Sequence, residues 1–208
     1  MVTKATSMSP IKSFFNSPYT FWGILSLPAI PMVIGLTSGD PKVVHQLLHP
    51  TGEFAARFMI ITMMITPLVM LFKGWRGPRW LMKRRRYLGV AAFAYALAHT
   101  ALYLLDEGAI AFTVGEISKL YIWTGWLAFL IFVPLAVTST DGWVRKLGPQ
   151  WKTLQRFVYG AAVLTLLHWA ALHDWGGVGA AMVHFVPLIV LEAYRLGHNL
   201  RRQRTRLV

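Results

Sequence analysis

Six long apolar stretches, separated by short polar segments, constrain this chain more than any other feature. A helix that crosses a bilayer needs about 20 mostly apolar residues, because the hydrocarbon core is about 30 Å thick and an α-helix rises about 1.5 Å per residue. Six segments meet or approach that length: Tyr19–Thr37, Phe54–Phe72, Tyr87–Leu105, Leu120–Val137, Leu154–His173 and Val178–Leu196. The sequence therefore predicts an all-α, polytopic membrane bundle of about six transmembrane helices.

The composition also favours a membrane protein. Only 14% of the 208 residues are charged, whereas soluble domains carry about 25%. Little chain is left between the apolar stretches, so we expect residues 1–208 to form a single transmembrane domain, with a polar head at 1–18 and a basic tail at 197–208. The chain contains no cysteine, which excludes disulfides, thiolate metal sites, iron–sulfur clusters and cysteine nucleophiles.

Lysine and arginine residues gather in alternate connecting segments. The head, the tail and segments 73–86 and 145–156 hold most of them, whereas the other connections hold the acidic residues Asp40, Asp106, Glu107, Glu116 and Asp174. By the positive-inside rule, both termini are expected on the cytoplasmic side. A net charge of +13 could also indicate nucleic-acid binding. Membrane topology explains the basic residues directly, so we expect a lipid bilayer and no nucleic acid as the partner.

Two histidines lie deep in predicted spans. His99 follows Arg86 by 13 residues and His168 follows Lys152 by 16, so rises of about 20 and 24 Å place both in the outer half of the bilayer. Two imidazoles at matching depth on different helices can bind a haem iron from opposite faces of the porphyrin. Alternatively, each histidine hydrogen-bonds a neighbouring helix and does no chemistry, and the spacing alone leaves both interpretations open.

Two further ionisable side chains in the outer half are candidates for the same site. Arg57 could pair with a haem propionate, because guanidinium groups suit carboxylates, or it could extend toward the outer interface. His184 could substitute for an axial ligand or hydrogen-bond one. Zinc is disfavoured because the closest histidine pair, His45 and His49, falls in an expected outer loop.

Three stretches resemble the MsrQ (YedZ) family, within the ferric-reductase-like transmembrane group. The stretch Arg84–Leu105 contains family positions at Arg85, Arg86, Leu88, Gly89 and His99. The stretch Leu135–Trp169 contains them at Thr138, Ser139, Leu147, Gly148, Trp151 and His168. A weaker match covers His49–Leu68, including Thr51-Gly52.

The resemblance implies a haem b-binding membrane subunit with His99 and His168 as axial ligands. In MsrQ proteins, electrons pass from a cytoplasmic flavin reductase or the quinol pool through haem to a periplasmic molybdopterin enzyme that repairs oxidised methionines. The chain would then be a redox subunit of the bacterial inner (cytoplasmic) membrane and not a stand-alone catalyst. Its acceptor would be a periplasmic methionine sulfoxide reductase.

The chain departs from the family at the inner level of the membrane. Gln155 stands where the family usually has histidine, and Arg85 stands one level below His99. We therefore expect one haem b, on the outer side, with a quinone or FMN near the basic segment as candidate carriers across the inner half. The alternative is a non-catalytic accessory or structural subunit of a larger membrane complex that retains the family fold.

Overall fold

The structure is a computed structural model that describes residues 14, 17–108 and 113–205. It falls into two compact units, residues 1–40 and 41–208. In the first unit, helices α2 (Pro18–Ser26) and α3 (Ala29–Leu36) meet at a bend of 53°. Pro28 lies at the bend, where its missing N–H and its ring prevent a continuous helix. The predicted span Tyr19–Thr37 is therefore bent at this proline.

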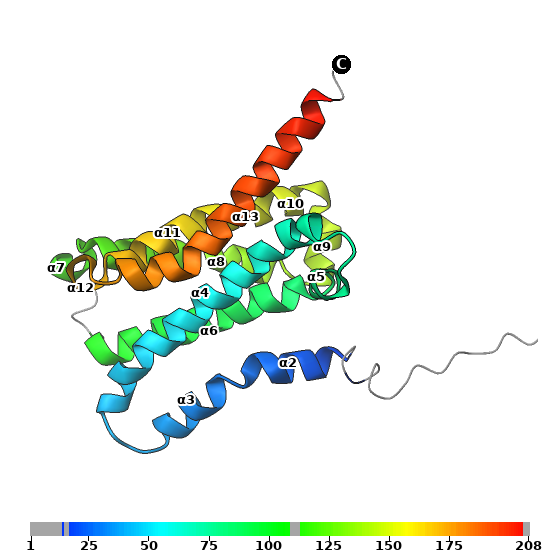
Figure 1. The fold of residues 1–208 in the computed structure, drawn as a ribbon. Helices are drawn as coiled ribbons and strands as arrows, with labels where there is room; N and C mark the ends of the chain where they lie inside the picture. The colour runs from blue at the N-terminus through cyan, green and yellow to red at the C-terminus, as the bar shows by residue number, and fades with distance from the viewer. Residues whose placement is uncertain (1–13, 15–16, 109–112, 206–208) are drawn as a thin grey trace, which may run out of the picture. The chain divides into compact units, whose positions relative to one another are not determined.

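Helices are the only regular secondary structure among the described residues of the second unit, as Figure 1 shows. Short helices and turns connect its long helices. In chain order its elements are α4 (Lys42–Leu71), α5 (Arg76–Met82), α6 (Arg85–Glu107), α7 (Val114–Ile117), α8 (Leu120–Val137), α9 (Asp141–Leu147), α10 (Pro149–Gln155), α11 (Val158–Ala170), α12 (Leu172–Trp175) and α13 (Val178–Arg204).

The predicted all-α membrane bundle is confirmed, with a different division into spans. Among the described residues, α4, α6, α8 and α13 are long and apolar enough to cross a membrane, and the bent pair of α2 and α3 could provide a fifth span. The predicted segment Leu154–His173 is divided among the end of α10, α11 and α12. Its central helix, α11, has 13 residues and covers only about 20 Å.

Two helices extend beyond the predicted apolar segments. Helix α4 begins at Lys42, so His45 and His49 lie on its first turns and not in a loop, which corrects the sequence-based expectation. Helix α13 continues to Arg204, so the basic tail is helical as far as that residue. In both cases hydropathy marks where the chain turns polar, whereas a helix continues wherever its backbone hydrogen bonds can still form.

Small residues allow the long helices of the second unit to approach closely. Helix α4 packs along α6, α8 packs along α11, and α13 lies against α4 and α11. The buried core contains alanines from four helices, among them Ala56, Ala92, Ala161 and Ala181. Close packing through small residues is a main source of helix association in membranes, where lipid removes the hydrophobic driving force.

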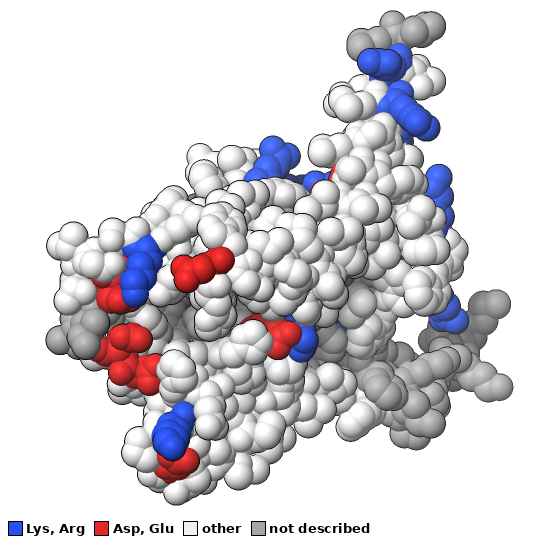
Figure 2. Space-filling view, turned by 60° about the vertical axis from the view of Figure 1, so that its left-hand side comes forward, with Lys and Arg blue, Asp and Glu red and all other residues white. Residues whose placement is uncertain are grey.

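Charged side chains occupy the two ends of this unit. Helices α5 and α9 lie at one end and α7 and α12 at the other (Figure 1). Figure 2 shows acidic side chains toward the left of the view and basic ones along the end of α13, with a largely uncharged surface between them. Within this unit, the basic segments 73–86 and 145–156 thus lie at the end opposite Glu116 of α7 and Asp174 of α12 (Figure 1).

Candidate functional site

A cavity of about 360 Å³ lies among α4, α6, α8 and α11. Its walls are mainly apolar and aromatic, and Ala56, Ala96, Ile122, Trp126, Phe129 and Trp169 contribute to them. Polar residues line another part of the cavity, including Glu116 of α7 and His173 of α12 together with His45, His49, Glu53 and Glu107. A mostly apolar pocket with a few polar groups is typical of a cofactor site.

Ion pairs border this polar part of the cavity. The Nζ of Lys119 donates to Glu116 Oε1 at 2.5 Å, and this hydrogen bond raises the pKa of Lys119 above its ordinary value. His45 Nδ1 lies 2.7 Å from Asp106 Oδ2. The His45 side chain is nonetheless 74% exposed.

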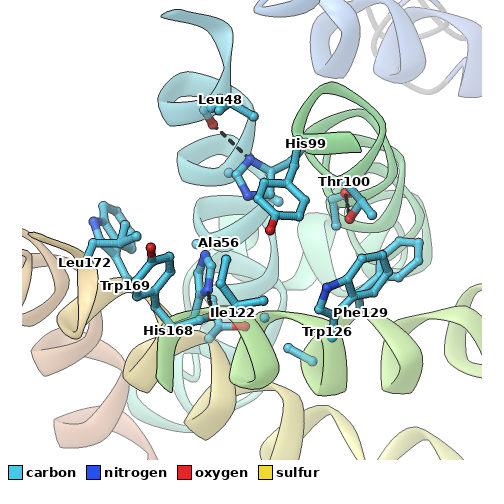
Figure 3. Close-up of a pocket in the computed structure, with 18 of the residues that line it drawn as sticks. Leu48, Ala56, His99, Thr100, Ile122, Trp126, Phe129, His168, Trp169 and Leu172 are labelled. Atoms are coloured by element: carbon cyan, nitrogen blue, oxygen red, sulfur yellow. Dashed lines mark hydrogen bonds between the residues drawn. The ribbon is translucent and has the colours of Figure 1, made fainter. Parts of the chain in front are cut away.

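His99 and His168 enter the cavity from different helices. Figure 3 shows His99 on α6 and His168 on α11, with the two rings facing the same space. Their ring centroids are 6.1 Å apart, and the ring planes are nearly perpendicular at 83°. A metal–imidazole bond is about 2 Å long and the ring centre lies about 1 Å beyond the nitrogen, so two imidazoles on one metal atom have centroids roughly 6 Å apart. The observed separation matches that value.

Each histidine is hydrogen-bonded through Nδ1 to a backbone carbonyl of another helix. His99 Nδ1 lies 2.9 Å from the Leu48 oxygen on α4, and His168 Nδ1 lies 2.5 Å from the Tyr121 oxygen on α8. A carbonyl can only accept, so both Nδ1 atoms carry the proton. Each Nε2 then holds a free lone pair, which is the state that binds a metal.

Two glycines that the sequence reasoning missed as site residues lie against these rings. Gly52 contacts the His99 ring and Gly125 contacts the His168 ring. The sequence identifies Gly52 only as a family position and gives no prediction for Gly125. The available signal was a shared pattern: each glycine follows a threonine and lies five residues after a leucine, in LLHPTG and LYIWTG.

Arg57 and His184 are brought together beside the cavity. The Arg57 Nη2 donates to Glu53 Oε1 at 2.5 Å, and its Nε donates to His184 Nε2 at 3.2 Å. His184 also stacks on Trp169, with ring centroids 4.8 Å apart. Glu53 and Trp169 line the cavity, so this cluster adjoins the histidine pair through them. The role of Glu53 was not foreseen from the sequence.

The two residues that depart from the family pattern, Gln155 and Arg85, make hydrogen bonds within the bundle. The Gln155 amide nitrogen donates to the Leu135 carbonyl at 3.0 Å. The Arg85 guanidinium donates to the Thr66 hydroxyl at 3.2 Å. Neither side chain is a good iron ligand, and each has a partner that fixes it to a neighbouring helix.

The side chains of the cavity suit a metal that is already coordinated by a prosthetic group and needs only two ligands from the protein. Within the described ranges, no group of three or more His, Cys, Asp or Glu side chains is arranged to hold a metal ion. Two neutral imidazoles between apolar walls instead fit the axial positions of a haem, whose porphyrin supplies the other four nitrogens. The Tyr103 hydroxyl supports this fit, because it is buried on a residue that lines the cavity and lacks a hydrogen-bond partner within the described structure.

Comparison with known proteins gives a consistent set of relatives. Residues 51–166 match the family described as ferric reductase like transmembrane component. The chain is 36% identical over 172 residues to the "Protein-methionine-sulfoxide reductase heme-binding subunit MsrQ" of Xanthomonas oryzae pv. oryzae (strain MAFF 311018), covering 80% of this chain and 75% of the relative. The proteins of the same name from Xanthomonas axonopodis pv. citri (strain 306) and Azospira oryzae are 39% and 32% identical, over 80% and 84% of this chain and 74% and 76% of theirs. No solved structure gives a significant match.

Proposed function

The chain belongs to the MsrQ family of ferric-reductase-like transmembrane proteins, and on that basis we propose that it is a haem-binding electron-transfer subunit of a bacterial inner membrane. The relatives are named heme-binding subunits of a protein-methionine-sulfoxide reductase. Bound haem would supply a one-electron carrier, because its iron alternates between two oxidation states. The protein's own part is to hold that group at a fixed depth and to tune it.

The histidine pair is the observation that carries this proposal. His99 and His168 are 6.1 Å apart between ring centroids, and both Nδ1 atoms are bound to carbonyls. Both would therefore bind the iron of one haem b through Nε2. The Tyr103 hydroxyl would donate a hydrogen bond to a polar group of the haem. The Arg57 guanidinium would bind a propionate in exchange for Glu53, and His184, whose Nε2 accepts a hydrogen bond from Arg57 Nε, would orient that guanidinium.

We place this haem on the outer side, near a periplasmic acceptor. The acceptor would be a methionine sulfoxide reductase of the molybdopterin type, reached from the end of the bundle that carries α7 and α12. Both termini would lie in the cytoplasm, because the basic segments gather at the opposite end. A single haem is favoured because Gln155 and Arg85 make hydrogen bonds within the bundle at the inner level. A quinone or FMN near segment 73–86 would deliver the electron.

The test is a reduced-minus-oxidised visible spectrum of protein purified from its native membrane, with haem counted per chain. We expect one reducible b-type haem per chain. His99→Ala and His168→Ala should each abolish the six-coordinate spectrum, whereas His198→Ala, outside the cavity, should keep it. Absence of haem from the native protein, or retention of an unchanged spectrum in both cavity variants, would refute the assignment.

A second candidate is a non-catalytic accessory subunit that keeps the family fold within a larger membrane complex. The position of Gln155 favours this candidate. A continuous electron relay would need an inner haem ligand there, whereas the Gln155 side chain donates a hydrogen bond to α8. Co-purification in fixed stoichiometry with a larger complex that lacks methionine sulfoxide reductase activity would support this reading. Electron delivery to a reductase from the purified pair would exclude it.

A further inference from the structure

Each cavity histidine lies directly on a glycine of the neighbouring helix. A Cβ atom built on Gly125 would be 2.7 Å from His168 Nδ1 and 3.0 Å from its Cε1. A Cβ built on Gly52 would be 3.1 Å from both His99 Nδ1 and Cε1. Any other residue at position 125 would therefore displace the ring, and any other residue at position 52 would press on it. The two contacts differ in tightness but are of the same kind.

The carbonyl that each ring binds lies one helical turn before its glycine. Leu48 precedes Gly52 by four residues, and Tyr121 precedes Gly125 by four. In an α-helix the Cα–Cβ bond points toward the N-terminus, so a side chain normally covers the turn before it. Glycine leaves that turn uncovered. The carbonyl, which accepts the N–H of the residue four positions later, can then accept a second hydrogen bond from an imidazole.

A threonine before each glycine completes the same arrangement twice. Thr51 Oγ1 donates to the Leu47 carbonyl at 2.7 Å, and Thr124 Oγ1 donates to the Leu120 carbonyl at 2.6 Å. Both threonines are buried. The pattern leucine, three residues, threonine, glycine thus occurs twice. On α4 it lies beside His99 of α6, and on α8 it lies beside His168 of α11.

We propose that Gly52 and Gly125 are positioning residues that set the orientation and tautomer of the two axial histidines, acting through the Leu48 and Tyr121 carbonyls. This inference rests on the proposed bis-histidine haem. By uncovering the carbonyl, each glycine keeps the proton on Nδ1 and directs Nε2 into the cavity. The hydrogen bond to Nδ1 also makes the imidazole a more basic ligand. If the glycines served only close helix packing, their replacement would lower stability and leave the iron ligands unchanged.

Two other glycines on the histidine-bearing helices provide matched controls. A Cβ on Gly89 of α6 would meet Thr62 Cγ2 at 4.0 Å, and one on Gly160 of α11 would meet Ile131 Cδ1 at 3.9 Å. Both are ordinary contact distances. Gly89→Ala and Gly160→Ala therefore add the same methyl group to a helix of the bundle without touching a cavity histidine.

The experiment compares purified holoprotein of the wild type with Gly52→Ala, Gly125→Ala and the two controls. The measurements are haem affinity, the electron paramagnetic resonance spectrum of the ferric protein, the reduction potential and the helical content of the haem-free protein. For Gly125→Ala we expect haem binding about 10-fold weaker or more, with part of the haem converted from six-coordinate low-spin to five-coordinate high-spin. Gly52→Ala should stay six-coordinate with a shifted resonance spectrum and potential, and both controls should match the wild type.

Several results would overturn the inference. One is a Gly125→Ala protein with the affinity, spectrum and potential of Gly160→Ala, and another is an equal change in all four variants. If Gly125→Ala does not accumulate, Gly52→Ala decides, because its 3.1 Å contact requires only a small displacement. An unchanged spectrum and potential in that variant would overturn the inference. A wild type without a bis-histidine spectrum would instead refute the proposed function, so the two failures are distinguishable.

Discussion

Replacing Glu53 by Gln removes the carboxylate that Arg57 faces on α4. Glu53 Oε1 lies 2.5 Å from Arg57 Nη2 and 3.7 Å from His184 Nε2. The Glu53 and Arg57 side chains are 20% and 39% exposed, so the pair is neither fully buried nor fully solvated. The substitution leaves the guanidinium at the rim of an apolar bundle without its anionic partner.

The expected cost lies between two limits. Breaking a fully buried ion pair from one side costs about 3–5 kcal/mol, and an exposed pair contributes about 0–1 kcal/mol. With intermediate exposure of both side chains, we expect Glu53→Gln to lower the free energy of unfolding by about 1–3 kcal/mol. Arg57→Met should cost a similar amount, because it leaves the carboxylate uncompensated.

The double variant Glu53→Gln/Arg57→Met separates a charge interaction from lost packing. If the cost of each single change comes from an unpaired charge, the double variant should be less destabilised than the sum of the two, with a coupling energy of about 1 kcal/mol or more. The assay is denaturant unfolding of the haem-free protein in detergent, followed by circular dichroism. Glu116→Gln is the control, because its pair with Lys119 joins residues three positions apart and connects no two long helices.

Two results would contradict this reasoning. Strict additivity in the double variant would mean that Glu53 and Arg57 do not stabilise each other. A Glu53→Gln protein as stable as Glu116→Gln would mean that the bundle solvates the guanidinium fully. Repeating the measurement with haem bound would then show whether a propionate takes the place of the missing carboxylate.

Three further predictions concern single side chains. Tyr103→Phe should leave the haem-free protein equally stable or slightly more stable, because the hydroxyl lacks a partner in the described structure. The same change should weaken haem binding up to about 10-fold. Unchanged affinity in a haem titration would contradict the assignment of this hydroxyl to the haem. Trp151→Phe should cost about 0.5–1.5 kcal/mol in denaturant unfolding, because it removes the 2.9 Å hydrogen bond from the indole to the Thr138 carbonyl, and an unaltered midpoint would count against that bond. The hydrogen bond and charge of Arg86 lower the pKa of Asp141, so their stabilising effect is present above the unfolded-state pKa of about 4 and is lost as the pH falls through the lower folded-state value. The difference in melting temperature between wild type and Asp141→Asn should therefore shrink only below about pH 4, and a difference that shrinks near neutral pH would contradict this origin.

Much of the fold could be predicted from the sequence because membrane helices are encoded locally. An apolar stretch of sufficient length must become a helix in a bilayer, since the backbone can satisfy its hydrogen bonds there in few other ways. Helix α8 accordingly has the predicted bounds, Leu120–Val137. The failures lie at polar boundaries: α4 starts well before its apolar stretch, and the segment expected from Leu154 to His173 is divided among several helices.

The candidate site likewise has features that could be predicted from the sequence and features that depend on helix packing. Matching depth predicted that His99 and His168 could meet, because depth follows from counting residues along a helix of fixed rise. Depth does not specify which face of a helix meets which neighbour. Only the packing of α6 on α4 and of α11 on α8 placed Gly52 and Gly125 against the two rings and gave each Nδ1 a carbonyl.

The sequence by itself therefore determined the helices, the separation of charge between their connections and the two histidines at one level. Only the tertiary structure decided which side chains form ion pairs and hydrogen bonds with one another. It joined Glu53 to both Arg57 and His184, and it bound Gln155 to the Leu135 carbonyl on α8. The physical reason is that helix formation and depth are local properties of the chain, whereas hydrogen bonds between helices depend on how their faces rotate and pack against each other.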